Sequence, residues 1–158
     1  VALSPTEALN ATGLDEVNFL FAPNKGSDFL PIRRVASGGE LSRLTLCTKS
    51  LVADAIPLPT LIFDEIDTGI SGDVALKMGK ILKDLAKRHQ VVSITHTPQI
   101  AVPANAHYFV YKKVKSNRTV TNVKLLSDAE RVEEVAIMLS GSPPSTSAIE
   151  NAKELLAS

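Results

Sequence analysis

Two short apolar runs separated by a helix-length segment constrain the fold of this chain more than any other feature. Residues 60–63 form the first run and lead directly into Asp64 and Glu65, and residues 91–95 form the second run and lead into His96. Both runs predict buried strands. The order strand, helix, strand is that of an α/β unit, whose parallel strands present their carboxyl ends to a ligand. The sequence therefore predicts an α/β fold with these three side chains at one edge of a sheet.

Helical periodicity and capping residues predict the helices around this unit. Apolar residues at helical spacing predict an amphipathic helix over residues 39–55; they are Leu41, Leu44, Leu46, Leu51 and Val52. Ser71 can cap a second helix, whose apolar stripe consists of Val74, Met78, Ile81, Leu82 and Leu85. Ser127 with Glu130, and Ser147 with Glu150, have the spacing of capping boxes and predict two helices toward the C-terminal end.

Apolar runs around turn residues predict two hairpins. Residues 17–21 and 29–33 flank a turn at residues 23–26, and residues 108–114 and 119–125 flank the polar pair Ser116 and Asn117. Residues 1–15 are polar and are predicted to be weakly helical, with Gly13 as the stop.

The composition is that of one globular domain without a charge bias. Of the 158 residues 44% are hydrophobic, and 17 Lys and Arg balance 17 Asp and Glu. Net charge therefore gives no general affinity for nucleic acid, and any DNA contact within this chain needs a local patch. The single cysteine, Cys47, excludes an internal disulfide, fits a reducing cytosol and is predicted to lie in the core. No apolar run approaches the ~20 residues that span a bilayer.

Ser37, Gly38, Gly39 and Glu40 open the first predicted helix, and two interpretations of them stay open. Ser37 and Glu40 match a capping box, which would make this an ordinary helix start. A cap does not need two adjacent glycines, however, and these allow the backbone to approach a ligand closely. The N-terminus of a helix also favours an anion such as phosphate.

Asp64 and Glu65 are candidates for metal binding and hydrolysis. One carboxylate held at a strand end can bind Mg²⁺, and the next can polarise an attacking water. The alternatives are ordinary strand-end carboxylates and, for His96, a core or capping role. A metal cluster of Asp64, Glu65 and His96 is a further interpretation, although no Cys or His spacing supports zinc. His89 and His107 are predicted to lie on the surface.

The ordered combination of these motifs resembles a known family. Residues 34–43, 61–72 and 95–101 are similar to the C-terminal part of RecN, a family of bacterial DNA repair ATPases related to the structural-maintenance-of-chromosomes (SMC) group. The resemblance runs from about residue 13 to the C-terminal end. It implies that residues 13–158 are the C-terminal lobe of an ABC-type ATPase head, with parallel strands flanked by helices and β-hairpins. Residues 1–12 would be the root of a coiled coil or a linker.

The resemblance also implies roles for the strand-end residues. Asp64 would hold Mg²⁺, and Glu65 would orient or deprotonate the attacking water. Asp67 would lie in the loop that crosses a dimer interface, and His96 would sense the γ-phosphate. The loop at residues 66–69 departs from the pattern of ABC transporters, which leaves the role of Asp67 open.

The segment Ser37, Gly38, Gly39 and Glu40 would be the signature loop of the head, which binds a nucleotide held by the opposite subunit. Ala36 precedes Ser37 where many transporters have leucine. The implied cofactors are ATP and Mg²⁺. The implied partners are the N-terminal Walker A half of the same protein, a second identical subunit and DNA. No membrane partner is implied, and the implied location is the cytoplasm, on the nucleoid.

The resemblance implies ATP hydrolysis in the repair and recombination of DNA double-strand breaks. The sequence contains no Gly-x-x-x-x-Gly-Lys-Ser/Thr phosphate loop and begins at Val1, so we expect an excised part that is inactive alone. Two alternatives are a non-catalytic DNA-bridging or dimerisation module gated by nucleotide, and a Mg²⁺-dependent phosphodiesterase built on Asp64, Glu65 and Asp67.

Overall fold

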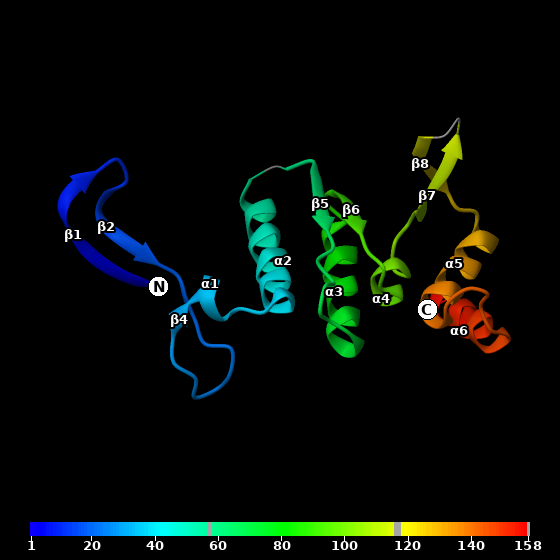
Figure 1. The fold of residues 1–158 in the computed structure, drawn as a ribbon, viewed down its shortest axis with the longest axis horizontal. Coiled ribbons are helices and arrows are strands. Elements are labelled where there is room, and N and C mark those ends of the chain that lie inside the picture. Colours follow the sequence, from blue (N-terminus) through cyan, green and yellow to red (C-terminus); the bar gives the residue numbers. More distant parts are fainter. Residues whose placement is uncertain (57, 116–117, 158) are drawn as a thin grey trace.

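The computed structural model describes residues 1–56, 58–115 and 118–157 and arranges them along one long axis (Figure 1). The strands are β1 Ala2–Asn10, β2 Gly13–Asn18, β3 Leu20–Phe21, β4 Leu30–Pro31, β5 Thr60–Asp64, β6 Gln90–Ile94, β7 Tyr108–Lys115 and β8 Arg118–Leu125. The helices are α1 Ile32–Val35, α2 Gly38–Ala55, α3 Gly72–Leu85, α4 Pro98–Ala101, α5 Asp128–Ser140 and α6 Thr146–Ala157.

The predicted strand–helix–strand unit lies in the middle of the molecule. β5 and β6 pair in parallel, from Thr60 opposite Gln90 to Asp64 opposite Ile94, and α3 connects them. The main core forms on one face of this sheet, where α2, α3 and α4 pack. Its buried members are Leu46, Ala53, Leu61, Phe63, Ile66, Met78, Leu82, Leu85 and Ile100. The α/β fold and the helix predicted over residues 39–55 are thus confirmed.

The other face of the sheet is uncovered, which corrects the expectation of two fully buried strands. Ile62, Val92 and Ile94 point to this face and are 57%, 42% and 52% exposed. Strands that are apolar on both faces are typical of sheets covered on both sides. The composition of β5 and β6 therefore suits a second layer, which none of the described residues supplies.

The apolar stripe of α2 is also largely uncovered. Leu46 is buried in the core, whereas the other predicted members of the stripe are exposed: Leu41, Leu44, Leu51 and Val52. Cys47 is exposed as well, so its predicted core position is wrong. The helix thus packs along a narrow line through Leu46 and Ala53 and leaves apolar surface free.

A second core joins the C-terminal helices. Val135 and Ala136 of α5 are buried with Ala148 and Ala152 of α6. The capping box of Ser127 and Glu130 at the start of α5 is confirmed. The capping box predicted at Ser147 and Glu150 is wrong, because α6 begins at Thr146, and the hydroxyl of Ser145 accepts the hydrogen bond from the amide of Ala148.

The hairpin predictions hold except at the N-terminal end. β7 and β8 form the predicted antiparallel hairpin; Ser116 and Asn117 at its turn lie outside the described residues. β3 and β4 form a shorter version of the first predicted hairpin. The helix expected in residues 1–15 is wrong, since β1 and β2 pair there, with Asn10 opposite Gly13. The division of the chain at residue 12 remains a prediction.

Two histidines are less exposed than expected. The Nδ1 atom of His89 lies 2.7 Å from the carbonyl oxygen of Leu58. His107 is half-buried, and burial together with the charge of Arg131 lowers the pKa of its imidazole. Neither residue lies at the strand ends that form the candidate site.

Candidate functional site

The parallel pairing places the candidate acidic residues at one edge of the sheet. Asp64 is the last residue of β5 and lies opposite Ile94, the last residue of β6. The amide of Glu65 donates a hydrogen bond to the carbonyl oxygen of Ile94 at 3.0 Å. Both carboxylates are exposed, so the sheet holds their backbones and leaves their side chains accessible.

Glu65 has a backbone conformation that is unusual for a residue with a side chain. Its φ is +46°, in the left-handed region. The turn that follows holds this conformation, because the carbonyl oxygen of Glu65 accepts hydrogen bonds from the amide of Thr68 at 3.2 Å and its hydroxyl at 3.0 Å. Strained backbone of this kind, costing about 1–3 kcal/mol, is concentrated at functional sites.

Asp67 connects the ends of the two strands. The residue is buried, 1% exposed, and its Oδ2 atom accepts a hydrogen bond from the hydroxyl of Thr95 at 2.5 Å. The Nδ1 atom of His96 lies 3.8 Å from the same oxygen. Burial by itself raises the pKa of the Asp67 carboxyl, but hydrogen bonding, led by Thr95, outweighs it and keeps the pKa below its ordinary value.

The arrangement around Asp67 leaves two groups available. The side chain of His96 is 76% exposed and lies at the surface beside the buried carboxylate. The Oδ1 atom of Asp67 is buried without a hydrogen-bond partner among the described residues. An unsatisfied buried oxygen calls for a functional explanation, and the carboxylate is well placed to orient the exposed imidazole.

Sequence reasoning missed the part played by Thr95. Its hydroxyl donates to Asp67 and accepts a hydrogen bond from the amide of Thr97 at 3.0 Å. It therefore fixes the segment that carries His96. The available signal was a threonine directly before the histidine, but its partner lies 28 residues away and becomes evident only once the strands are paired.

The predicted capping box at the start of α2 is confirmed. The amide of Ser37 donates to Oε2 of Glu40 at 2.7 Å, and the amide of Glu40 donates to the hydroxyl of Ser37 at 3.3 Å. These contacts, led by the backbone of Ser37, lower the pKa of Glu40. The first hydrogen bond of the helix runs from the amide of Leu41 to the carbonyl oxygen of Ser37. The amides of Gly38 and Gly39 precede it, at the positively polarised end of the helix.

The two glycines differ in their surroundings. A Cβ atom on Gly39 would lie 3.1 Å from the carbonyl oxygen of Gly69 and 3.2 Å from a side-chain carbon of Ile70. The start of α2 thus packs on the loop that follows Asp64 and Glu65. A Cβ atom on Gly38 would meet nothing within 4 Å, so packing within this chain does not explain that glycine.

Gly39→Ala is expected to destabilise the chain by about 1–2 kcal/mol, because overpacking against backbone outweighs the gain in helix propensity. Gly38→Ala is the matched control and is expected to be neutral or stabilising by up to about 1 kcal/mol. Urea unfolding followed by circular dichroism measures both. Equal effects of the two substitutions would contradict the close contact between α2 and the loop at Gly69.

The acidic residues are better suited to binding Mg²⁺ together with nucleotide phosphates than to enclosing the ion with protein ligands alone. Among the described residues, no three or more His, Cys, Asp or Glu side chains gather as metal ligands, so Asp64, Glu65 and His96 do not form the metal cluster considered above. Mg²⁺ is commonly bound through one or two carboxylates together with substrate phosphates. The exposed carboxylate of Asp64 at a rigid strand end fits that arrangement.

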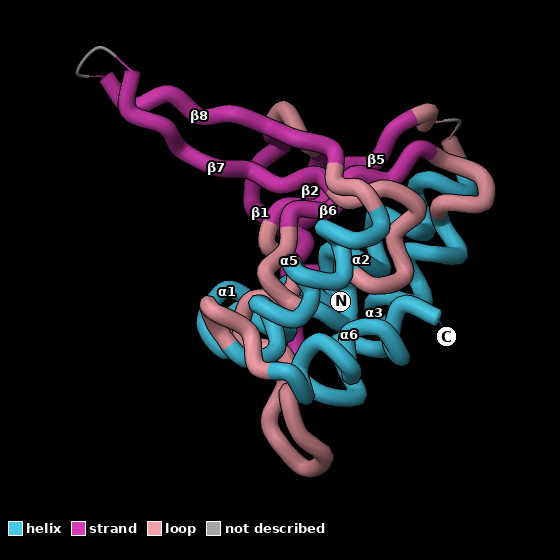
Figure 2. The backbone as a smooth tube through the Cα atoms, turned by 90° about the vertical axis from the view of Figure 1, so that its right-hand side faces the viewer, coloured by secondary structure: helices cyan, strands magenta, loops and turns pink. Residues whose placement is uncertain are grey.

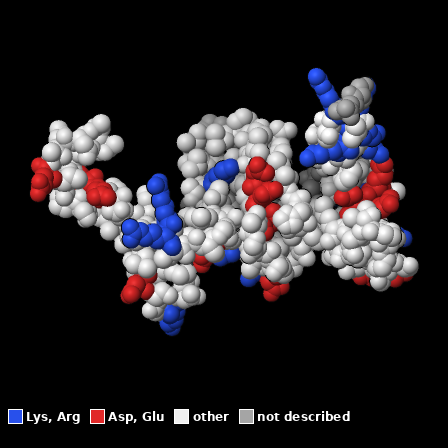
Figure 3. Space-filling view, viewed as in Figure 1, with Lys and Arg blue, Asp and Glu red and all other residues white. Residues whose placement is uncertain are grey.

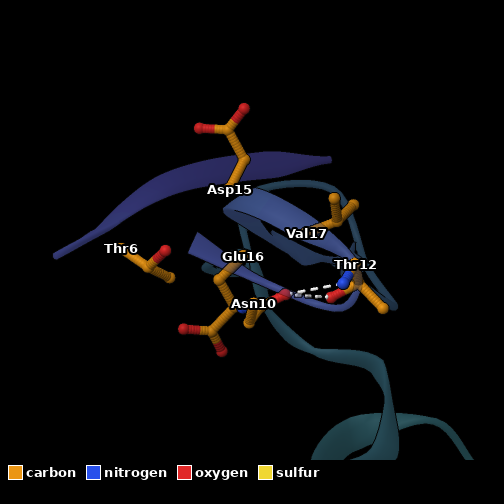
Figure 4. A pocket seen from close by; sticks show the side chains of 6 residues that line it. All are labelled: Thr6, Asn10, Thr12, Asp15, Glu16 and Val17. Atoms are coloured by element: carbon orange, nitrogen blue, oxygen red, sulfur yellow. Dashed lines mark hydrogen bonds between the residues drawn. The ribbon is translucent and has the colours of Figure 1, made fainter. Parts of the chain in front are cut away.

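A separate hollow lies on the β1–β2 hairpin (Figure 4). It is lined by Thr6, Asn10, Thr12, Asp15, Glu16 and Val17, none of which belongs to the strand ends or to the start of α2. It is therefore not part of the candidate site. In the described part of the chain, no helix has the length and apolar character needed to cross a membrane.

The chain is similar to bacterial proteins named DNA repair protein RecN. It is 44% identical to the protein of Vibrio cholerae over 91% of this chain and 26% of that protein. It is 43% identical to the protein of Haemophilus influenzae over 95% of this chain and 27% of that protein. It is 45% identical to the protein of Deinococcus radiodurans over 99% of this chain and 27% of that protein. The chain thus spans about a quarter of the length of the curated relatives it matches. No protein-family model matches it.

Solved structures of SMC heads share the fold. One is a chain from a study of ATP-driven dimerization and DNA-stimulated activation of SMC ATPases, with a TM-score of 0.51 and 23% identity over 69% of this chain and 66% of that chain. Another is the Smc head bound to the C-winged helix domain of ScpA, with a TM-score of 0.55 and 24% identity over 75% of this chain and 34% of that chain. At this identity the likeness concerns the fold alone.

Proposed function

This chain belongs to the RecN family of DNA repair proteins, and we propose that it supplies the signature, Walker B and switch elements of an ATPase head. The complete head hydrolyses ATP during repair and recombination of DNA double-strand breaks, in the cytoplasm and on the nucleoid. Residues 13–158 form the C-terminal lobe of this head, and residues 1–12 connect it to a coiled coil.

The observation that carries the proposal is the edge formed by β5 and β6. Asp64 supplies a carboxylate for Mg²⁺, which neutralises phosphate charge when it is bound. Glu65, held in place by Ile94 and Thr68, orients or deprotonates the attacking water. His96, positioned by the buried Asp67, contacts the γ-phosphate. Phosphoryl transfer depends on positioning and charge more than on covalent chemistry. This edge of the sheet supplies both the positioning and the charge.

The uncovered side of the sheet supports an N-terminal Walker A half as the partner. Ile62, Val92 and Ile94 present apolar surface on the face opposite α2 and α3. Burial of apolar surface contributes about 25 cal/mol per Å², so this face favours association with a second layer. We infer that the part of the protein that carries the phosphate loop covers it.

The signature loop acts on a nucleotide held by a second, identical subunit. The exposed Gly38 has open space around it, and its amide lies at the N-terminus of an 18-residue helix. Ser37 and Gly39 flank it, with Glu40 closing the cap. This arrangement suits a phosphate that arrives from outside the chain, which supports a homodimer with nucleotide at its interface. DNA is the further partner that a repair function requires.

The 158-residue chain by itself is expected to show no ATP affinity in the micromolar range and no hydrolysis. The backbone amides and lysine of a phosphate loop supply most of the binding to the β- and γ-phosphates, and the sequence contains no such loop. Isothermal titration with ATP and Mg²⁺ tests this, with the chain plus its N-terminal half as the positive control. Micromolar binding by the chain alone would contradict a divided head.

A further inference from the structure

The β7–β8 hairpin projects from the helices as a two-stranded arm (Figure 2). Its pairing is regular from Tyr108 opposite Leu125 to Lys115 opposite Arg118. Eight residues per strand at about 3.3 Å each give an arm of about 26 Å. The proximal end of the arm is anchored by the ion pair between Lys124 of β8 and Glu130 of α5. Phe109 and Tyr111 of β7 are half-buried there, with their ring centroids 5.8 Å apart. The distal half extends beyond this anchor.

Positive charge is concentrated on this arm. Between residues 108 and 125 the sequence has no Asp or Glu, although the whole chain has 17 basic and 17 acidic residues. The five cations of the arm are Lys112, Lys113, Lys115, Arg118 and Lys124. Figure 3 shows basic residues gathered on the hairpin and acidic residues on α5 beneath it. The arm is therefore a local basic patch of the kind that net charge conceals.

Two of the five cations have partners within the chain. Lys124 pairs with Glu130 of α5, and this contact, followed by hydrogen bonds from Ser127, lowers the pKa of Glu130 to about 2. The Nζ atom of Lys113 lies 5.1 Å from the centroid of the Tyr111 ring. Lys124 therefore attaches the arm to α5, whereas the contact of Lys113 lies within β7.

The other three cations have no such partners. Lys112, Lys115 and Arg118 are exposed, and none of them pairs with a carboxylate in the ranges that the structure describes. Lys115 and Arg118 lie directly opposite one another, and like charges in that position destabilise a hairpin. The stability of the hairpin therefore does not account for these residues, whereas an external anion does.

We propose that the distal half of the β7–β8 arm binds the phosphate backbone of duplex DNA through Lys112, Lys115 and Arg118. The inference rests on the proposed function, from which it takes DNA as the partner. The pairing register puts Lys115 and Arg118 on one face of the ribbon and Lys112 on the other. The major groove of B-DNA, about 12 Å wide, admits a two-stranded ribbon. Cations on both faces then reach phosphates on both sides of the groove.

The contacts fix position and carry no base specificity. Among the residues that the structure describes near the tip, the neighbours of the cations are Val114, Thr119 and Val120, which lack the amide and carboxylate groups that form bidentate contacts with bases. Lysine contacts to phosphate position a protein on the duplex without reading it. Binding is therefore salt-dependent and similar for duplexes of different sequence.

The test compares two triple variants of the full-length protein. The arm variant is Lys112→Gln, Lys115→Gln and Arg118→Gln, and the control neutralises three exposed lysines of α3, Lys77→Gln, Lys80→Gln and Lys83→Gln. Affinity for two duplexes of unrelated sequence is measured by fluorescence anisotropy over a series of salt concentrations. Plotted as the logarithm of the association constant against the logarithm of the salt concentration, the data have a negative slope. The arm variant is expected to reduce the magnitude of this slope by about 3, at roughly 0.9 for each phosphate that the variant no longer neutralises.

The control variant is expected to keep the slope of the unmodified protein. An unchanged slope in the arm variant, or an equal loss in the control, would overturn the inference, as would failure of the unmodified protein to bind duplex DNA. ATP turnover measured without DNA separates the two proposals. If the arm variant has the reduced salt dependence but the unmodified protein shows no ATP turnover, the inference about the arm stands and the proposed ATPase function is refuted.

Discussion

Glu65→Gln in the full-length protein is expected to lower ATP turnover by roughly 10²-fold or more while ATP-bound dimers accumulate. Glutamine keeps the size of the side chain and can still form hydrogen bonds, but it cannot accept a proton from water. The backbone hydrogen bonds that hold residue 65 beside Ile94 do not involve the side chain, so the fold is retained. Steady-state phosphate release measures turnover, and size-exclusion chromatography with ATP measures the dimer.

Asp64→Asn is the companion variant and separates the two carboxylates. It is expected to weaken nucleotide binding that depends on magnesium, because a neutral amide is a poorer ligand for a hard cation than a carboxylate. Mild and equal losses in both variants would mean that Asp64 and Glu65 are ordinary strand-end residues. Absence of ATP turnover in the unmodified full-length protein, with nucleotide-dependent dimers still forming, would favour the alternative of a DNA-bridging module that nucleotide only gates.

Ser37→Arg is expected to abolish dimerisation driven by ATP while leaving ATP binding at the phosphate loop of the same subunit nearly intact. The arginine fills the approach to Gly38 and removes the hydroxyl of the cap. Ser127→Arg is the matched control, since Ser127 closes an equivalent capping box with Glu130 at the start of α5. Both variants are expected to lose about 1 kcal/mol of stability through the cap, but only Ser37→Arg should block the dimer.

The outcomes distinguish the two interpretations of the signature segment. If Ser37→Arg and Ser127→Arg lose stability equally and both still dimerise, Ser37 is a helix cap and nothing more. If Ser37→Arg dimerises and hydrolyses ATP at the normal rate, the action of the loop on a second subunit is wrong. Analytical ultracentrifugation with ATP, alongside thermal unfolding, provides both readings.

The sequence was sufficient where local signals act alone. The apolar runs at β5 and β6 and the boxes at Ser37 and Ser127 each specify their element within a few residues, and the structure confirms them. The N-terminal hairpin was missed because both of its strands are mostly exposed, so that no alternation of apolar and polar residues marks them. The cap of α6 was misplaced because Ser145, Thr146 and Ser147 can all cap a helix, and packing of Ala148 on α5 selects among them.

Features that depend on residues distant in the sequence, or on a second layer over the sheet, could not be predicted from the sequence. The contact between Asp67 and Thr95 exists because two strands pair, and neither residue signals the other in the sequence. The packing of Gly39 on Gly69 likewise joins two motifs that the sequence presents separately. The apolar face at Ile62 and Val92 was expected to be buried, since hydrophobicity indicates that a surface is to be covered but not by which chain.

We expect Ser37 of one subunit and Glu65 of the other to act on the same nucleotide, and mixing two inactive variants shows whether they do. In a heterodimer of Ser37→Arg with Glu65→Gln, one site has both residues intact and the other has neither. Random pairing at equal concentrations would make half of the dimers mixed and return about a quarter of the normal rate in a symmetric dimer. Because one of the two interfaces in a mixed dimer carries Ser37→Arg, this quarter is the upper limit.

The control mixes the unmodified full-length protein with the double variant that carries Ser37→Arg and Glu65→Gln on one chain. In those mixed dimers each site lacks one of the two residues, so only dimers of the unmodified protein should hydrolyse ATP. We expect phosphate release to recover when the two single variants are mixed, and we expect none from the mixed dimers of the control. No recovery on mixing the single variants, with each still binding ATP, would contradict it.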